Sequence, residues 1–296
     1  MIAIDLPAAR EDYLTIRGRR LDLNTLVDER VFDERYARSL GLRFANARPF
    51  EHLRLQGLFD PALLELVAEE FDLFPRQDWN TFTTRQEKTF RSAPGARLGP
   101  ASQLYFSIVN SGYFAEFLGH VTNVHNLIVD QTLFGGGLHE SRNGGKFGIH
   151  CDFDRHGHNG LRNEMVMLTY LNKDWDPAWG GELELWDART RTCVTKVAPD
   201  FGTTLLMKNT PVSLHGHPHP LAMPEGRTRR SVASYYYTNS ESVEQILKGR
   251  TTSFMERALP DSVQTSAKRL ARSWMPPALW AMARRLKRRA KAGTEG

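Results

Sequence analysis

Three residues of metal-binding type occur at an informative spacing in this chain. His150 and Asp152 are separated by one residue, and His215 follows 63 residues after Asp152. Side chains two apart on a strand point to the same face, so the first two converge while Cys151 points away. His215 follows the apolar run 203–207, which indicates that it lies at the end of another strand. Two histidines and one carboxylate on one face of an octahedral ion leave three positions open, as an iron(II) oxygenase requires.

A zinc site is an alternative, because His156 and His158 follow closely and could join His150. A structural zinc site is normally closed by four ligands, often including cysteines. The chain has two cysteines. Cys151 is expected to face away and Cys193 is remote, so we disfavour zinc. A solvated turn with a capping aspartate is the other simple interpretation of the H-x-D triplet.

Further motifs extend downstream of the triplet. They are Tyr170-Leu171-Asn172-Lys173-Asp174-Trp175, Gly180-Gly181-Glu182-Leu183, His215-Gly216, and Arg230 followed by Tyr235-Tyr236 in the pattern R-x-x-x-x-Y-Y. With these motifs, residues 146–238 resemble the prolyl-4-hydroxylase-like branch of the Fe(II)/2-oxoglutarate-dependent dioxygenases.

The resemblance implies roles for individual residues. His150, Asp152 and His215 would ligate iron(II). Arg230 would form a salt bridge with the distal carboxylate of 2-oxoglutarate, because a guanidinium fork suits a carboxylate. Tyr170 would hydrogen-bond the same carboxylate.

Two arginines and three histidines compete for these roles. Arg230 leads an alternation of residues 232, 234 and 236 on one strand face, so Arg229 is expected to face the other way. The alternative is that Arg230 is a surface arginine in a basic run. His217 and His219 share an extended face with His215. We predict His215 as the ligand because Gly216 completes the H-G motif, and we expect the other two near the ligands or on the surface.

The resemblance also implies a reaction. It is the hydroxylation of an unactivated C–H bond of an organic substrate by O2, with release of succinate and CO2. The cofactors implied are Fe(II), 2-oxoglutarate as co-substrate, and ascorbate as an optional addition. The substrate stays open among an envelope glycan or lipid, a peptidyl residue and a small molecule. The alternative is a non-catalytic β-helix sensor or scaffold that retains the metal pocket, which the triad together with Arg230 disfavours.

One residue departs from the family pattern. Relatives often place a tyrosine near the co-substrate ten residues before the first ligand, where this chain has Glu140. A carboxylate beside a dicarboxylate is unfavourable, so Glu140 must turn outward or contact the primary substrate.

The elements that position these residues predict an α+β, mainly β fold. We expect a double-stranded β-helix (jelly roll, cupin-like) core, braced by N-terminal helices and followed by a C-terminal basic helix. Asp60-Pro61 begins one helical pattern and Ser111-Gly112 another. Short strands with turn residues between them are predicted at 124–134, 147–150, 165–171, 182–187, 193–197, 203–208 and 231–238. The predicted divisions are an arm (1–45), a helical support (46–122), the core (123–245) and a basic tail (246–296).

Composition agrees with one large domain in a reducing compartment. The chain has 296 residues, 41% of them hydrophobic, and two cysteines. It lacks a secretory-type start and an apolar run long enough for a membrane span. We therefore expect a cytoplasmic protein, with peripheral contact at the inner face of the membrane as described next.

The net charge of the chain, +5, comes from its tail. Residues 262–296 contain nine Lys or Arg and one acid, a net of +8, so residues 1–261 sum to −3. Leu279, Met282 and Leu286 fall at helical spacing among these charges. Such a helix can lie on an anionic membrane through residues 273–291. A solvated terminal helix is the alternative. Nucleic acid is disfavoured, because no base-stacking aromatic platform accompanies the charge.

We predict that this tail binds anionic lipid vesicles at about 1 kcal/mol per basic residue near the surface. Binding should weaken as salt rises, and deletion after Arg272 should remove most of it. Vesicle co-sedimentation of the full-length and truncated proteins at low salt is the measurement. Identical partitioning of the two proteins would show that the tail is a solvated or packed terminus.

Overall fold

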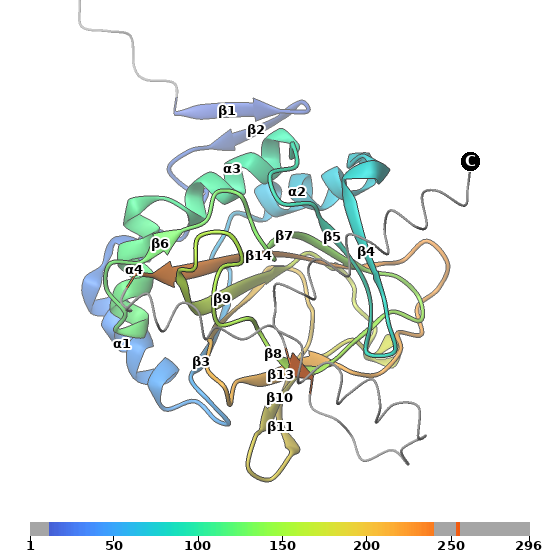
Figure 1. Ribbon diagram of the computed structural model, residues 1–296. Coiled ribbons are helices and arrows are strands. Elements are labelled where there is room, and N and C mark those ends of the chain that lie inside the picture. The colour runs from blue at the N-terminus through green and yellow to red at the C-terminus, as the bar shows by residue number, and fades with distance from the viewer. Residues whose placement is uncertain (1–11, 240–252, 255–296) are drawn as a thin grey trace, which may run out of the picture. The chain divides into compact units, whose positions relative to one another are not determined.

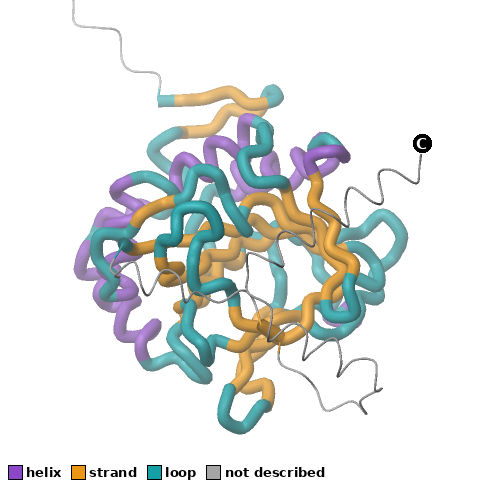
Figure 2. Tube along the Cα trace, in the orientation of Figure 1, coloured by secondary structure: helices purple, strands orange, loops and turns teal. Residues whose placement is uncertain are grey.

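Short strands form the centre of the protein, and helices gather along one side of them (Figures 1 and 2). The computed structural model describes residues 12–239 and 253–254. The predicted basic tail helix lies outside these residues. The described residues belong to one compact unit. None of the described helices is long and apolar enough to cross a membrane.

Thirteen strands form one large sheet, in which every pairing between strands of the described residues is antiparallel. The strands are β3 (His52–Gln56), β4 (Trp79–Thr83), β5 (Glu87–Ser92), β6 (Ile128–Val129), β7 (Gly137–Ser141), β8 (Lys146–Cys151), β9 (Arg162–Tyr170), β10 (Leu183–Asp187), β11 (Thr192–Val197), β12 (Thr203–Lys208), β13 (Leu214–His217), β14 (Arg229–Thr238) and β15 (Ser253–Phe254). A separate hairpin joins β1 (Tyr13–Ile16) to β2 (Arg19–Asp22).

The sheet is curled into two facing halves. Its order is β11-β10-β13-β8-β5-β7-β14-β9-β12-β3. Strand β5 joins the halves, because Glu87 and Lys88 pair with β8 while Phe90 and Arg91 pair with β7. A curled antiparallel sheet of this kind is the predicted double-stranded β-helix. The predicted fold class is therefore confirmed for the described residues.

Four α-helices brace the outer face of one half. They are α1 (Glu34–Ala45), α2 (Pro61–Leu73), α3 (Pro100–Val109) and α4 (Gly112–Thr122), with short 3-10 turns η1 (Glu29–Phe32), η2 (Arg76–Asp78) and η3 (Pro177–Trp179). The two predicted starts are confirmed. Asp60 accepts a hydrogen bond from the backbone N–H of Leu63 at 3.0 Å, and Ser111 accepts one from Phe114 at 3.3 Å.

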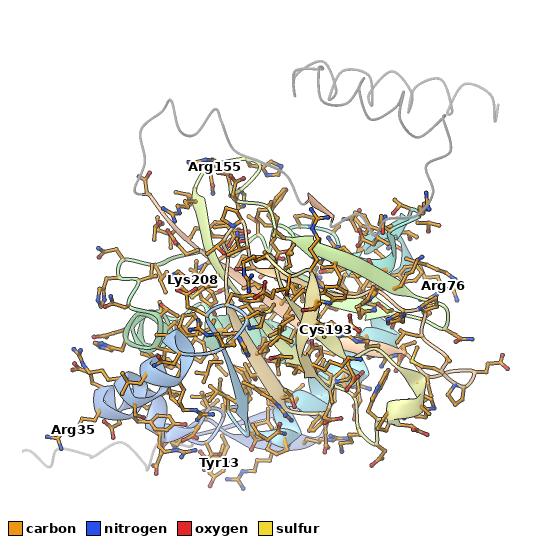
Figure 3. The ribbon with its side chains drawn as sticks, turned by 90° about the horizontal axis from the view of Figure 1, so that it is seen from below. Tyr13, Arg35, Arg76, Arg155, Cys193 and Lys208 are labelled. Carbon is orange, nitrogen blue, oxygen red and sulfur yellow. The ribbon has the colours of Figure 1, made fainter. Side chains whose placement is uncertain are left out.

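Two hydrophobic clusters lie on opposite faces of the same strands. On β9, Met165 and Met167 pack toward the helices, whereas Val166 and Tyr170 pack between the two halves of the sheet. Side chains fill that space, while the labelled Arg35 lies at the periphery (Figure 3). Both faces of these strands are therefore buried, which hides the usual alternation of apolar and polar residues.

Several elements of the structure differ from those predicted from the sequence. The region 46–122, predicted to be mainly helical, also contains β3, β4 and β5. The arm 1–45 holds the β1-β2 hairpin and the 12-residue helix α1. The predicted strand 124–134 is a strand only at Ile128–Val129. Strands β3 and β6 pair with β12 and β14, far along the chain, so their stability depends on distant residues. All of these strands are short, so the alternation of apolar and polar residues within each one is a weak signal.

Candidate metal centre and adjoining cavity

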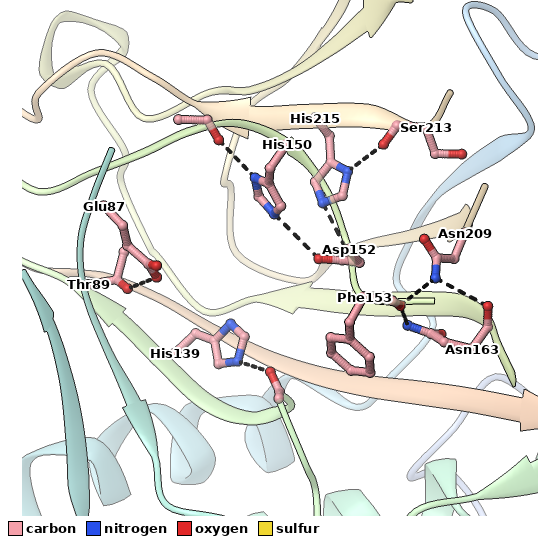
Figure 4. A network of polar contacts seen from close by, with 12 residues as sticks. Glu87, Thr89, His139, His150, Asp152, Phe153, Asn163, Asn209, Ser213 and His215 are labelled. Carbon is pink, nitrogen blue, oxygen red and sulfur yellow. Dashed lines mark hydrogen bonds and ion pairs between the residues drawn. The ribbon is translucent and has the colours of Figure 1, made fainter. Parts of the chain in front are cut away.

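His150, Asp152 and His215 come together in the structure (Figure 4). Their candidate ligand atoms all lie within 4.8 Å of one another, and all three residues are buried. Nε2 of His150 is 3.4 Å from Oδ1 of Asp152, and Nε2 of His215 is 3.7 Å from Oδ2. Among the described residues, this is the one group of metal-binding side chains so arranged.

Strand pairing brings the three side chains together. His150 lies near the end of β8, and Asp152 follows directly after that strand. His215 lies on β13 and is the register partner of His150 across the two antiparallel strands. Directly opposed residues share a face and have closely spaced Cβ atoms. Cys151 has the opposite orientation, and its Sγ donates to the carbonyl of Pro211 at 3.2 Å.

Each histidine ring is oriented by a backbone carbonyl close to it in sequence. Nδ1 of His150 lies 2.8 Å from the carbonyl oxygen of Gly148, and Nδ1 of His215 lies 3.0 Å from that of Ser213. We assign the proton to Nδ1 in both rings, because a carbonyl can only accept. The Nε2 lone pairs then point toward Asp152, which is the arrangement of metal-ligating histidines.

The electrostatics favour the ionised carboxylate. Burial alone would raise the pKa of Asp152, but His215, His150 and Arg91 together hold it below its ordinary value. Burial lowers the pKa of His215, against the opposing effect of Asp152. At neutral pH the site therefore offers a carboxylate and a neutral imidazole, the protonation states that a metal ion needs.

A bulge in β8 explains why the residue after His215 is a glycine. His215 pairs with His150, but His217 pairs with Phe147, so β8 uses one extra residue over this stretch. A Cβ on Gly216 would lie 2.7 Å from the carbonyl oxygens of both Phe147 and Gly148. Only glycine allows β13 to approach the bulge so closely.

A single cavity contains the three residues and continues deeper between the sheet halves. Its lining includes Val166, Leu168, Tyr170, Leu183, His217, Arg229, Ser231, Thr89, Arg91, His139 and Tyr235. Tyr235 lies close to Asp152, and burial together with that charge raises the pKa of Tyr235 well above its usual range.

The predicted orientation of the two arginines is wrong. Arg229 lines the cavity, where its Nε donates to the Gly181 carbonyl at 2.8 Å. Arg230 points to the other side of β14, where its guanidinium bonds to Ala68 and Asp72 on helix α2. Every second residue of β14 faces inward. Because both faces of the strand are buried, the sequence shows that its side chains alternate but does not show which set faces the cavity.

Tyr170 lies in the cavity as predicted. Its hydroxyl accepts a hydrogen bond from Nη2 of Arg229 at 3.4 Å, and the guanidinium carbon lies 5.0 Å from the ring centroid. Burial raises the pKa of Tyr170, and Arg229 opposes part of this effect. The phenol therefore keeps its proton and can donate it to an anion.

Glu140 turns outward. Its carboxylate accepts from Nε of Arg142 at 2.8 Å and lies 3.5 Å from Nε of Arg230. Arg230 is the register partner of Glu140 on β14, so the two share the outer face of the sheet. The residue borders the cavity, but its carboxylate contacts Arg142 and Arg230 on the outer face, so its charge is balanced there.

The remaining histidines differ in burial and in the residues that they contact. His217 is buried in the cavity, whereas the side chain of His219 is 61% exposed. Burial and the charge of Arg229 hold the pKa of His217 well below its ordinary value. His156 lies against Asp130, with Nε2 3.2 Å from its carboxylate, so it does not join His150 in a zinc site.

Two further residues line the cavity from strands that carry none of the sequence motifs. Arg91 on β5 ion-pairs with Glu87 and lies over the Phe147 ring, 4.9 Å from its centroid. His139 on β7 bonds to the Gly135 carbonyl at 3.1 Å, and burial followed by Arg91 lowers its pKa to about 3. The alternation of Glu87, Thr89 and Arg91 on one face was the available signal.

The fold and this centre define a class. A double-stranded β-helix with two histidines and a carboxylate inside is a metal-binding scaffold suited to oxygenase chemistry. Residues 136–237 match the model of the 2OG-Fe(II) oxygenase superfamily. The matched segment contains His150, Asp152 and His215, so the similarity to this superfamily covers the part of the chain that holds the candidate metal centre. No curated protein matches the chain in sequence.

Several solved structures are similar to the chain at low identity. A prolyl-4-hydroxylase from Pseudomonas putida is 16% identical with a TM-score of 0.49, and the match covers 69% of this chain and 100% of that one. A prolyl hydroxylase from Trichoplax adhaerens, in complex with a hypoxia inducible factor peptide, is also 16% identical with a TM-score of 0.49, over 69% and 90%. HygX from Streptomyces hygroscopicus, with nickel, 2-oxoglutarate and hygromycin B bound, is 13% identical with a TM-score of 0.44, over 63% and 82%.

We predict that Gly216→Ala destabilises the protein by about 1–3 kcal/mol, because the new methyl group must displace the β8 backbone. Urea unfolding followed by circular dichroism measures this. Gly112→Ala is the matched control, since a Cβ there meets nothing within 4 Å and its backbone φ is not positive. Equal unfolding free energies for Gly216→Ala and wild type would contradict the close approach of β13 to the bulge.

Proposed function

We propose that the protein is an Fe(II)- and 2-oxoglutarate-dependent hydroxylase. The donor set supports this function, because two oriented imidazoles and an ionised carboxylate suit iron(II) and leave positions open. His150, Asp152 and His215 would hold the metal. When bound, iron(II) and 2-oxoglutarate supply the oxidising power by which O2 hydroxylates an unactivated C–H bond, with release of succinate and CO2.

The observation that carries the proposal is the buried charge of Arg229. The residue is 6% exposed, and no carboxylate of the described residues lies within salt-bridge distance of its guanidinium. A buried cation without an anion is costly. A dicarboxylate that reaches from the metal centre would supply the missing charge, and the guanidinium fork is suited to a carboxylate.

The other cavity residues fit this assignment. Tyr170 can donate its hydroxyl proton to the carboxylate at Arg229. Val166, Leu168 and Leu183 line the cavity with apolar side chains, which would exclude water and strengthen the ion pair. Tyr235 lines the cavity close to the Asp152 carboxylate. The primary substrate would enter from the remaining side, near Arg91 and His139.

The first expected outcome concerns the metal. One Fe(II) should bind per chain, and His150→Ala, Asp152→Ala or His215→Ala should abolish substrate-dependent succinate formation with little loss of fold. Iron content after dialysis and succinate released over a library of peptidyl, glycan and small-molecule substrates are the measurements. A protein that binds iron and 2-oxoglutarate but releases no succinate with any substrate would be the sensor or scaffold instead.

The second expected outcome concerns the co-substrate. Arg229→Gln should weaken 2-oxoglutarate binding by roughly 10- to 100-fold, because a charge-assisted bond to a buried carboxylate is lost. Calorimetric titration of the manganese(II)-loaded protein measures the affinity without turnover. Arg230→Gln is the matched control, one residue away and on the other face, and should bind as wild type does. The reverse result would restore Arg230 as the carboxylate partner.

A further inference from the structure

His217 occupies a position that the proposed function does not yet use. It lies on β13 two residues after His215, so both side chains face the cavity. It is 4% exposed, and its Nδ1 is buried without a hydrogen-bond partner among the described residues. Native proteins rarely leave such an atom unpaired, because its lost hydration is not replaced.

The neighbours of His217 place it beside the part of β10 that leads from the metal centre toward Arg229. Gly216 pairs with Glu184 on β10, so His217 lies beside Leu183. Gly181 lies two residues before Leu183, and its carbonyl accepts a hydrogen bond from Nε of Arg229. His217 thus flanks the path from His215 to Arg229.

A ligand role for His217 at the metal does not fit this geometry. Its ring nitrogens are not among the group of atoms that lie within 4.8 Å of one another. The bulge in β8 sets His215, and not His217, opposite His150. The unpaired nitrogen instead belongs to the part of the cavity that the far end of 2-oxoglutarate would occupy.

We infer that His217 is a third co-substrate-binding residue, whose Nδ1–H donates to the distal carboxylate held by Arg229 and Tyr170. The inference rests on the proposed function. It gives the distal carboxylate one charged partner and two neutral donors. It also gives the buried nitrogen a partner, which would be present whenever the co-substrate is bound.

The test combines a residue change with a ligand change. Full-length manganese(II)-loaded wild type, His217→Leu and His217→Asn are titrated calorimetrically with 2-oxoglutarate and with 2-oxopentanoate, which lacks the distal carboxylate. His217→Leu should weaken 2-oxoglutarate binding about tenfold, because one hydrogen bond to a charged group is lost, and should leave 2-oxopentanoate unaffected. His217→Asn should recover most of the affinity, since its amide nitrogen can replace Nδ1.

His219→Leu is the matched control, because this histidine is exposed two residues further along and should bind both ligands as wild type does. Manganese(II) affinity and thermal unfolding of each variant establish that the fold and metal centre persist. An equal loss for both ligands, or no loss for either, would overturn the role of His217. A wild-type protein that binds no 2-oxoglutarate would refute the proposed function, and this inference with it.

Discussion

The buried carboxylate of Asp152 is the constraint on which the site depends. A carboxylate inside a protein stays ionised only if neighbouring groups replace its lost hydration. Here His150 and His215 approach its oxygens from paired strands, and Tyr235 lies close to it from the facing half of the sheet. The two halves must therefore curl toward each other, and strand β5 joins them at the edge.

The strands around this carboxylate are packed on both faces. On the inner side of β14, Arg229, Ser231 and Tyr235 line the cavity. On its outer side, Val232 packs with the helices, and the Tyr236 hydroxyl bonds to the carbonyl of Val109 at the end of α3. The helices therefore hold the strand that carries the cavity arginine, although none of them contributes a residue to the metal centre.

Sequence reasoning grouped His150, Asp152 and His215, which the structure brings together, because H-x-D on a strand has a local signature. It selected Tyr170 through a motif, and this residue lines the cavity. It did not locate Arg229, because a strand buried on both faces shows a period of two without indicating which set faces inward. Strand β5, with Arg91, was also missed. It forms a hairpin with the neighbouring strand β4, but the pairs with β7 and β8 that bring Arg91 to the cavity are made with segments far along the chain, so the local pattern does not reveal them.

The adjacent arginines have a consequence for how this chain can vary in evolution. The loop between β13 and β14 can change in length at modest entropic cost, provided that β14 still begins with the same residue facing inward. A single insertion within β14 would turn the following part of the strand over, and would exchange polar cavity groups for side chains that pack on the helices. Divergence in substrate preference is therefore expected to enter through loops, while the length of β14 stays fixed.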